Sequence, residues 1–259
     1  MTNKHLTVWS LALSLALAGC NQGNKDMQNT AEAGIAQTEN AAGITSDNNG
    51  IDENTEVAPF EISLTGDIDP KTWTAGQEAS VTIDRFPNSL AEFKQLQKQL
   101  GNTPQGAVMI QLAAFELYNR NTDAGTEAIK LCNVESNVNS VLRIIQDKFG
   151  KNNLDPGSVR KFLVATYLDG ATPQNAYNPS KPYTIHVRSS KVNDYQRSEM
   201  LKGYVLYLQV HSSAYDTEWR GCEVIKQKGN EYYSVSNCPA MYTGCKDIDF
   251  ECEEEYQGL

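Results

Sequence analysis

Residues 203–211, Gly-Tyr-Val-Leu-Tyr-Leu-Gln-Val-His, place apolar side chains on both faces of an extended chain. This pattern is typical of a central strand, because both faces of such a strand are covered. Residues 183–188 alternate apolar and polar side chains and predict a strand with one buried face. Two more extended segments, 219–226 and 231–236, flank Lys228-Gly229-Asn230, which suits a hairpin turn. The C-terminal half therefore predicts an antiparallel β-meander of about four strands.

The half before this meander predicts about five short helices. Each has apolar side chains at the three- and four-residue spacing that covers one helix face. Ser89 can cap the first helix and Gly101 can end it. Thr103-Pro104 favours a second helix start, because Pro at the first helical position has no amide hydrogen to leave unpaired. The other three are expected around 124–132, around 141–149 and after Pro156-Gly157, from Val159 to Thr166.

Helices followed by an antiparallel meander define the fold class as α+β, with the helices packed on one face of the sheet. Two short strands, 60–64 and 79–85, precede the helices and predict an N-terminal strand or hairpin extension. Composition divides the remainder of the chain. We expect a signal peptide at 1–19, a disordered tether at 20–58, the extension at 59–85, the α+β domain at 86–245 and an acidic tail at 246–259.

Charge follows the same division. The 259 residues carry a formal net charge of −10, although residues 59–245 are neutral overall. Residues 21–58 contain one lysine, seven acidic residues and no aromatic side chain, so they lack the apolar surface needed to offset the entropy of ordering. Residues 246–259 contain one lysine and six acidic residues. This acidity, and the lack of a Lys/Arg cluster, argue against a nucleic-acid partner.

The N-terminus predicts a signal that targets the protein for export. A short basic start is followed by an apolar stretch from Leu6 to Leu17 and then by Leu17-Ala18-Gly19-Cys20. This arrangement resembles the bacterial lipoprotein box, and the resemblance implies cleavage before Cys20 and acylation of its thiol and new amine. An uncleaved membrane helix is the alternative, but it needs about 20 apolar residues. Asn21, in place of the Asp that retains some lipoproteins at the inner membrane, favours the outer membrane of the cell envelope.

A second resemblance concerns the core. The stretch 170–183, which contains Gly-Ala-Thr-Pro-Gln-Asn-Ala-Tyr-Asn-Pro, is similar to a motif of an uncharacterised bacterial domain of unknown function. Residues 103–107, 217–221 and 236–239 extend the similarity over roughly 86–245. The resemblance implies an α+β domain found in bacterial lipoproteins and supplies no activity, ligand or catalytic residue.

The same stretch has two physical interpretations. Three prolines within ten positions keep the chain extended, which suits a stiff connection between the last helix and the first main strand. Alternatively, Tyr177 and Tyr183 form a ledge that holds a peptide or a glycan. With His186 and Trp219 they make up the candidate ligand surface, since eleven of the twelve tyrosines lie between Tyr167 and Tyr256.

Catalytic motifs are scarce in this sequence. It contains no Gly-x-Ser-x-Gly elbow, no His-Glu-x-x-His and no phosphate-binding glycine loop. Two histidines, His186 and His211, remain after removal of the signal peptide, and either could serve as a general base beside a carboxylate. Scattered acids that could supply one include Asp169, Asp216 and Glu218.

Five cysteines remain if Cys20 is acylated, so at least one is free. Cys132 and Cys222 lie in apolar patterns and are interpreted as small buried residues. Cys238 and Cys245 flank a loop with Pro and Gly, and we expect them to form a disulfide in an oxidising compartment. Cys245 with Cys252 is the competing pair. The spacing of the last three cysteines is too wide for a zinc knuckle, and we expect no metal and no cofactor.

These patterns leave two functions in play. The first is a lipid-anchored, non-catalytic binding or interaction module of the cell envelope, with a glycan or protein partner. The second is a hydrolase or transferase of envelope polymers that uses a dispersed carboxylate pair. Two carboxylates about 5–10 Å apart in a cleft would favour the second function.

The lipoprotein box yields a direct prediction. Cys20→Ser removes the thiol that receives the lipid, so the variant should accumulate as an unprocessed precursor. We expect wild-type cells fed labelled palmitate to label the protein and the variant to remain unlabelled. Equal label in both would show that the acyl chains, if any, are attached elsewhere.

Overall fold

The computed structural model describes residues 57–149, 159–191, 195–214, 217–242 and 244–248, which lie within one compact unit. The expected signal peptide, Cys20, nearly all of the tether and most of the acidic tail lie outside the described residues. Within the described part, no helix combines the length and apolarity needed to cross a membrane.

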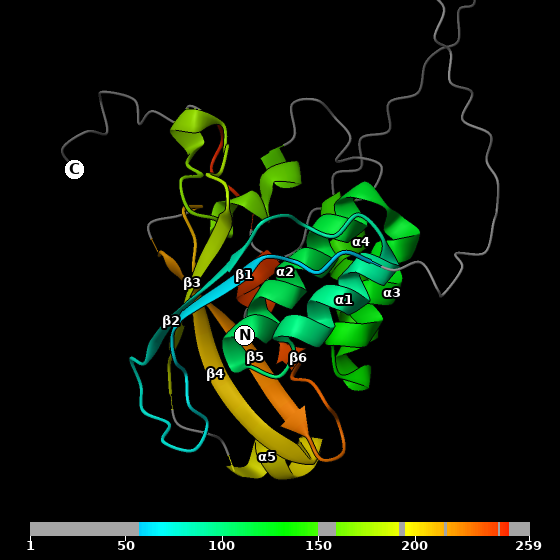
Figure 1. Cartoon of the computed structure of the whole chain (residues 1–259), viewed down its shortest axis with the longest axis vertical. Helices are drawn as coiled ribbons and strands as arrows, with labels where there is room; N and C mark the ends of the chain where they lie inside the picture. Colours follow the sequence, from blue (N-terminus) through cyan, green and yellow to red (C-terminus); the bar gives the residue numbers. More distant parts are fainter. Residues whose placement is uncertain (1–56, 150–158, 192–194, 215–216, 243, 249–259) are drawn as a thin grey trace, which may run out of the picture. The chain divides into compact units, whose positions relative to one another are not determined.

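Six antiparallel strands form one sheet in which spatial order equals chain order (Figure 1). Two more strands belong to this sheet than the meander alone predicts, because the N-terminal hairpin joins it through pairing of the second and third strands. The predicted α+β class is confirmed. The strands are β1 (Ile62–Gly66), β2 (Glu78–Ile83), β3 (Tyr183–Ser189), β4 (Gly203–His211), β5 (Trp219–Gln227) and β6 (Ser234–Asn237).

Alternation along the strands gives the sheet two different faces. Ala79, Val81 and Ile83 of β2 are buried, and so are Ile185 and Val187 of β3. The intervening side chains of both strands are polar and lie on the other face. We call these the core face and the outer face of the sheet.

Helices α1 to α4 cover the core face (Figure 1). Their bounds are α1 (Leu90–Leu100), α2 (Pro104–Arg120), α3 (Thr122–Cys132) and α4 (Glu135–Phe149). Helix α2 contacts β2 to β6 as well as the other three helices. Fourteen of its 17 residues are buried, as expected for a helix whose every side faces protein.

The local signals at the helix ends act as predicted. The Ser89 hydroxyl accepts a hydrogen bond from the Glu92 amide at 3.2 Å, and the Gly101 amide donates to the Gln97 carbonyl at 2.8 Å. The Thr103 hydroxyl accepts from the Gly106 amide at 3.1 Å, directly before Pro104. Both N-caps satisfy amide hydrogens that have no partner inside the helix.

The expected helix at 159–166 is not an α-helix. Val159–Phe162 and Ala165–Tyr167 are two short 3-10 turns, and the fifth α-helix is α5 (Tyr195–Leu201), between β3 and β4. The apolar spacing at 162–166 is real, since Leu163 and Val164 are buried. Spacing alone does not distinguish a continuous helix from consecutive tight turns that bury the same side chains.

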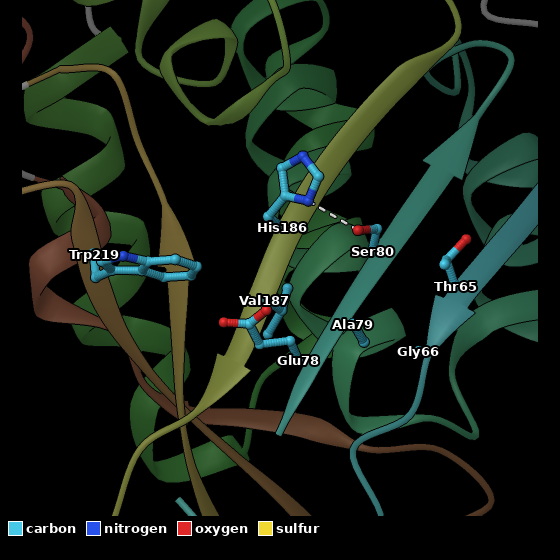
Figure 2. Close-up of a pocket in the computed structure, with 8 residues that line it drawn as sticks. All are labelled: Thr65, Gly66, Glu78, Ala79, Ser80, His186, Val187 and Trp219. Carbon is cyan, nitrogen blue, oxygen red and sulfur yellow. Dashed lines mark hydrogen bonds between the residues drawn. The ribbon is translucent and has the colours of Figure 1, made fainter. Parts of the chain in front are cut away.

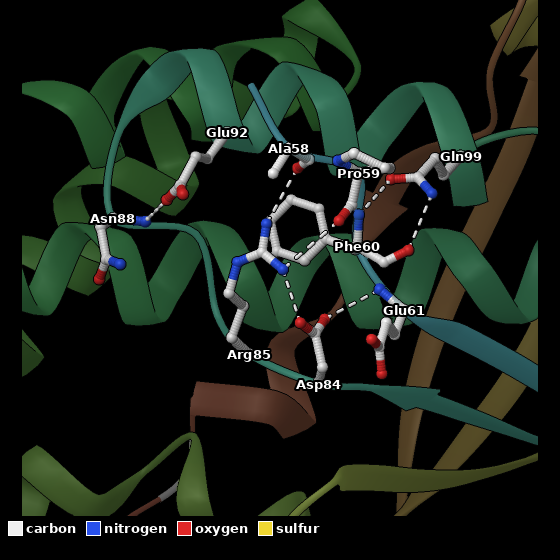
Figure 3. A network of polar contacts seen from close by, with 9 residues as sticks. All are labelled: Ala58, Pro59, Phe60, Glu61, Asp84, Arg85, Asn88, Glu92 and Gln99. Carbon is white, nitrogen blue, oxygen red and sulfur yellow. Dashed lines mark hydrogen bonds and ion pairs between the residues drawn. The ribbon is translucent and has the colours of Figure 1, made fainter. Parts of the chain in front are cut away.

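A polar network fastens the entry into β1 (Figure 3). The side-chain amide of Gln99 on α1 accepts from the Phe60 amide at 2.9 Å and donates to the Phe60 carbonyl at 3.0 Å. The Arg85 guanidinium lies 4.1 Å from the centre of the Phe60 ring and donates to the Ala58 carbonyl at 2.9 Å. Asp84 pairs with Arg85 at 2.6 Å and accepts from the Glu61 amide at 3.1 Å. The network therefore ties residues 58–61 to α1 and to the end of β2.

Helix α3 approaches α2 most closely at Gly125, which is buried. A β-carbon built there would overlap the backbone of Tyr118 on α2. Only a residue without a side chain allows this approach of the two helices.

Gly125→Ala should destabilise the protein, although the same change at an exposed helix position stabilises by about 1 kcal/mol. Because the two helices must separate, we expect the free energy of unfolding to fall by about 2 kcal/mol or more. Urea titration measures this difference. Glu127→Ala, on the exposed side of α3, is the control and should cost about 0.5 kcal/mol at most. An unchanged or increased stability of Gly125→Ala would contradict the packing described here.

Candidate functional site

The outer face of the sheet is divided into an apolar end and a polar end. At the apolar end, Leu201 of α5 packs on Val205, Tyr207 and Ile225 of β4 and β5. At the polar end, no helix of the described residues lies over the face, and the side chains of β2 and β3 carry hydroxyl, imidazole and charged groups. A ligand can therefore reach the polar end without displacing part of the fold.

Cross-strand pairing joins polar side chains of β2 and β3. Ser80 lies directly opposite His186, and Thr82 lies directly opposite Thr184. The Ser80 Oγ and His186 Nδ1 atoms are 2.8 Å apart, and the two threonine hydroxyls are 2.9 Å apart. Direct cross-strand neighbours on one face lie close enough for such bonds.

Asp169 extends this row at the start of the loop before β3. Its carboxylate lies 2.9 Å from His186 Nε2, and its amide donates to the Thr184 carbonyl at 3.0 Å. An ionised carboxylate can only accept, so Nε2 carries the hydrogen and Nδ1 accepts the Ser80 hydroxyl. Ser80, His186 and Asp169 therefore form an oriented chain of donors, with the His186 and Asp169 side chains 44% and 45% exposed.

Trp219 at the start of β5 forms the other side of the polar end. The Arg188 guanidinium lies 4.0 Å from the centre of the Trp219 ring, and Arg188 Nε donates to the Gln209 side chain at 2.8 Å. His211, opposite Trp219 on β4, meets the indole ring edge-on with 5.5 Å between ring centres. These contacts hold the indole in place, because a cation and a second ring fix its orientation.

Between these groups the outer face contains a pocket of about 210 Å³. Figure 2 shows Trp219 on one side, Ser80 and Thr65 on the other, and His186 between them. Glu78 is the charged residue among those that line it, and its partner across the strands is Arg188, whose guanidinium lies over the Trp219 ring, so the two charges offset each other at the pocket. Gly66 closes one edge with a positive φ of 73°, where a β-carbon would meet the Glu78 carbonyl.

A second pocket, of about 200 Å³, lies farther along the same face near β6. Its aromatic residue, Tyr207, is 7% exposed, and the Lys191 ammonium group lies 4.2 Å from the centre of its ring. Both aromatic rings carry a cation, but Tyr207 is buried whereas Trp219 is partly exposed, and the Trp219 pocket is therefore the stronger candidate site.

The four predicted ligand residues separate into two pairs. His186 and Trp219 line one pocket, whereas Tyr177 and Tyr183 do not belong to it. Tyr177 is 1% exposed, packs on Phe162 with 5.9 Å between ring centres, and donates its hydroxyl to the Lys246 carbonyl at 2.8 Å. Its role is to fix residues 244–248, and the expectation of an exposed Tyr177 is corrected accordingly.

Tyr183 begins β3 on the core face and stacks on Phe86, with 5.1 Å between ring centres. The loop before it is a structured connection, because Thr172 and Asn175 cap a 3-10 turn reciprocally at Pro173–Asn175. A ledge formed by the two tyrosines is therefore absent from this structure. The connection is ordered but not extended as its prolines predict, because a 3-10 turn at Pro173–Asn175 is followed by left-handed φ angles at Ala176 and Tyr177.

Sequence reasoning missed Ser80, Thr65 and Glu78. Each lies in the N-terminal hairpin, which the sequence predicts as an extension against the main domain and not as part of its sheet. The alternation within 79–85 already indicates which side chains share a face, but only the pairing of β2 with β3 brings them to His186. Of the scattered acids, Asp169 lies 2.9 Å from His186 Nε2, and Glu218 lies 3.9 Å from His211 Nε2. Asp216 lies outside the described residues.

Three of the described cysteines lie away from this pocket, on the core side of the sheet. Cys132 and Cys222 are buried in the core, as predicted, and Cys238 is buried beside them. Cys132, Cys222, Cys238 and Cys245 are all reduced thiols in this structure, so the expected Cys238–Cys245 bond stays a prediction. Cys252, the alternative partner, lies outside the described residues. Among the residues described, no group of three or more His, Cys, Asp or Glu side chains has an arrangement that could hold a metal ion.

Comparison with known proteins identifies the core. Residues 85–249 match a family model described as "Domain of unknown function (DUF6935)". The chain belongs to this family. The match begins just before α1 and ends after Cys245, so the DUF6935 region contains α1 to α5 and β3 to β6 but not β1 and β2. No curated protein and no solved structure matches the chain. The pocket thus combines residues of the DUF6935 region, such as His186 and Trp219, with residues of the preceding hairpin, such as Ser80 and Glu78.

Proposed function

We propose that this protein is a lipid-anchored lipoprotein of the bacterial cell envelope. It binds a neutral glycan in the pocket between Trp219 and Ser80. The anchor rests on the lipoprotein box that ends at Cys20. The outer membrane is the proposed location, with no nucleic-acid partner. The observation that carries the binding proposal is the placement of an oriented indole beside a row of hydroxyl groups on an uncovered sheet face.

The chemistry of the lining matches that of a sugar ring. A sugar ring presents C–H groups on its faces and hydroxyl groups around its edge. Trp219 supplies an aromatic surface held by Arg188 and His211, and such surfaces contribute most of the binding energy in many sites. Ser80, Thr65 and Glu78 supply donors and acceptors for hydroxyl groups.

Charge narrows the ligand class. Glu78 lines the pocket, and the Asp169 carboxylate lies beside His186 at its edge. Among the described residues, Arg188, which is opposite Glu78, is the one guanidinium beside these two carboxylates, so an anionic polymer, such as a phosphate-containing or uronic-acid chain, meets no excess of positive charge here. A neutral oligosaccharide needs no such excess and uses the carboxylates as acceptors of hydroxyl hydrogen bonds.

The glycan proposal predicts a selective loss of binding. We expect the purified protein to bind neutral glycans on an oligosaccharide array. Titration calorimetry with the glycan that binds most tightly should then show that the affinity of Trp219→Ala is at least tenfold weaker than that of the wild type. Tyr204→Ala is the matched control, because Tyr204 is an exposed aromatic residue of β4 outside the pocket and should leave the affinity unchanged. Equal affinity of wild type and Trp219→Ala, or retention of anionic glycans alone, would contradict the proposal. Thermal unfolding of each variant verifies that the fold is intact.

A second function is favoured by one specific observation, the chain from Ser80 through His186 to Asp169. Nucleophile, base and orienting carboxylate occur in this order in serine hydrolases, where the arrangement is recognised by geometry and roles. Here Ser80 lies within β2, between β1 and β3, and its amide belongs to the hydrogen-bonded sheet. That amide cannot also stabilise an oxyanion, which hydrolysis requires. Binding is therefore the better supported function.

A fluorophosphonate probe, which labels activated serines, separates the two functions. We expect the wild-type protein to remain unlabelled, because the Ser80 amide is bonded within the sheet and cannot serve as an oxyanion donor. Label that is lost in Ser80→Ala and in His186→Ala but retained in Thr82→Ala would establish the hydrolase instead. Thr82 is the matched control, since its hydroxyl lies on the same face of β2 and pairs with a threonine rather than a histidine.

A further inference from the structure

Three cysteines meet under the sheet, on the core face and away from the proposed glycan pocket. Cys132 ends α3, Cys222 lies in β5, and Cys238 directly follows β6. Each is 1% exposed, and all three belong to one hydrophobic core. They come from segments as far apart as α3 and β6, so the tertiary structure alone brings them together.

The pairing of β5 with β6 decides which two of these cysteines face each other. Ile225 pairs with Ser234 and Val224 with Val235, but Glu223 pairs with Asn237 because a bulge at Ser236 shifts the register by one residue. Continued by one step, the shifted register places Cys222 opposite Cys238. Without the bulge, Cys222 would oppose Asn237, and Cys238 would point toward the outer face.

Side-chain contacts agree with this register. Cys222 and Cys238 are both 1% exposed within the core beneath the sheet, as the shifted register requires. The Cys238 Sγ atom also lies 2.9 Å from the Tyr242 hydroxyl oxygen. Residues directly opposite in an antiparallel pair have Cα atoms about 4.5–5.5 Å apart, within the range that a disulfide bridges.

We propose that Cys222 and Cys238 are a redox pair that closes into a disulfide across β5 and β6 in an oxidising compartment. The presence of this bond in cells rests on the export that the proposed function includes. The pair replaces the Cys238–Cys245 bond expected from sequence spacing. Cys245 follows the 3-10 turn Pro239–Tyr242, and no strand register places it opposite Cys238.

The oxidant is a disulfide, either a low-molecular-weight one or that of a thiol oxidoreductase. One cysteine thiolate attacks it, forming a mixed disulfide and releasing the first reduced thiol. The second thiolate then attacks the cysteine sulfur of the mixed disulfide and expels the second thiol. Two S–H bonds are lost and one S–S bond forms, and the two electrons and two protons end on the reduced oxidant.

The folded core protects the pair from late oxidation. The contact with Cys238, together with burial, raises the pKa of the Cys222 thiol well above its usual range. Because the thiolate is the reactive form, exchange in the folded reduced protein is slow. Helix α2 also covers β5 and β6. The bond therefore forms while the β5–β6 hairpin is still accessible, during folding.

Cys132 is the matched control within the same cluster. Its thiol donates to the Gln111 side chain at 3.3 Å, and its sulfur accepts from the Asn133 side chain at 3.4 Å. It lies at a helix end and outside the β5–β6 register, so we expect it to remain a free thiol.

The test starts from the full chain, reduced and unfolded in urea, and refolds it with oxidised and reduced glutathione. We expect peptide mapping without reductant to find a Cys222–Cys238 peptide pair, lighter by two hydrogen atoms than the reduced peptides. Closing a loop of this length should raise the thermal midpoint of the oxidised protein over the reduced one by roughly 6–12 °C. Cys132→Ala should keep the bond and the shift, and Cys222→Ala should lose both.

Two other results would overturn the pairing. One is a disulfide between Cys238 and Cys245, Cys132 or Cys252, and the other is the recovery of folded protein with Cys222 and Cys238 still reduced. A separate experiment tests export. The protein is expressed in cells either with or without its residues 1–20, and its disulfides are mapped in each case. Oxidation only with these residues supports both proposals. A pair that oxidises in glutathione but stays reduced in cells with residues 1–20 present would contradict export and leave the pairing intact.

Discussion

The pairing of β2 with β3 is the contact on which the rest of the structure depends. Ser80 and His186 pair directly although they are 106 positions apart in the chain. Helices α1 to α4 all lie between these two strands in sequence, yet the strands are neighbours in the sheet. The chain must therefore leave the sheet after β2, form the four helices and return to the sheet beside β2. They do so on the core face, where α2 is enclosed by the sheet and the other helices.

The same pairing creates the candidate site. Because side chains alternate along a strand, the register that buries Val81 and Ile185 also directs Ser80 and His186 to the outer face. Asp169 joins them through a backbone bond to Thr184, and Trp219 is held by Arg188 and His211. This placement supports the proposed binding function over hydrolysis. The Ser80 hydroxyl bonds to His186 and its oxygen can still accept from a ligand, whereas its amide is already bonded to a neighbouring strand.

At the opposite edge of the sheet, one inserted residue in β6 decides which side chains point to the core face. The bulge at Ser236 turns Cys238 inward, opposite Cys222 and beneath α2. The two ends of the sheet thus carry different chemistry on different faces, with polar recognition outside and a thiol pair inside. A change in either register would move the affected side chains to the wrong face.

The local features of the fold could be predicted from the sequence alone. The caps at Ser89 and Thr103, the strands at 183–188 and 203–211, and the α+β class follow from hydrogen-bonding capacity and apolar spacing, which act within a few residues. The helix expected at 159–166 failed for the same reason, since consecutive 3-10 turns satisfy the same spacing. Only the tertiary structure decided that Tyr177 is buried, that Ser80 meets His186 and that Cys222 faces Cys238. The last two depend on strand register, and the burial of Tyr177 depends on its packing against Phe162 and Lys246; local side-chain preferences specify neither.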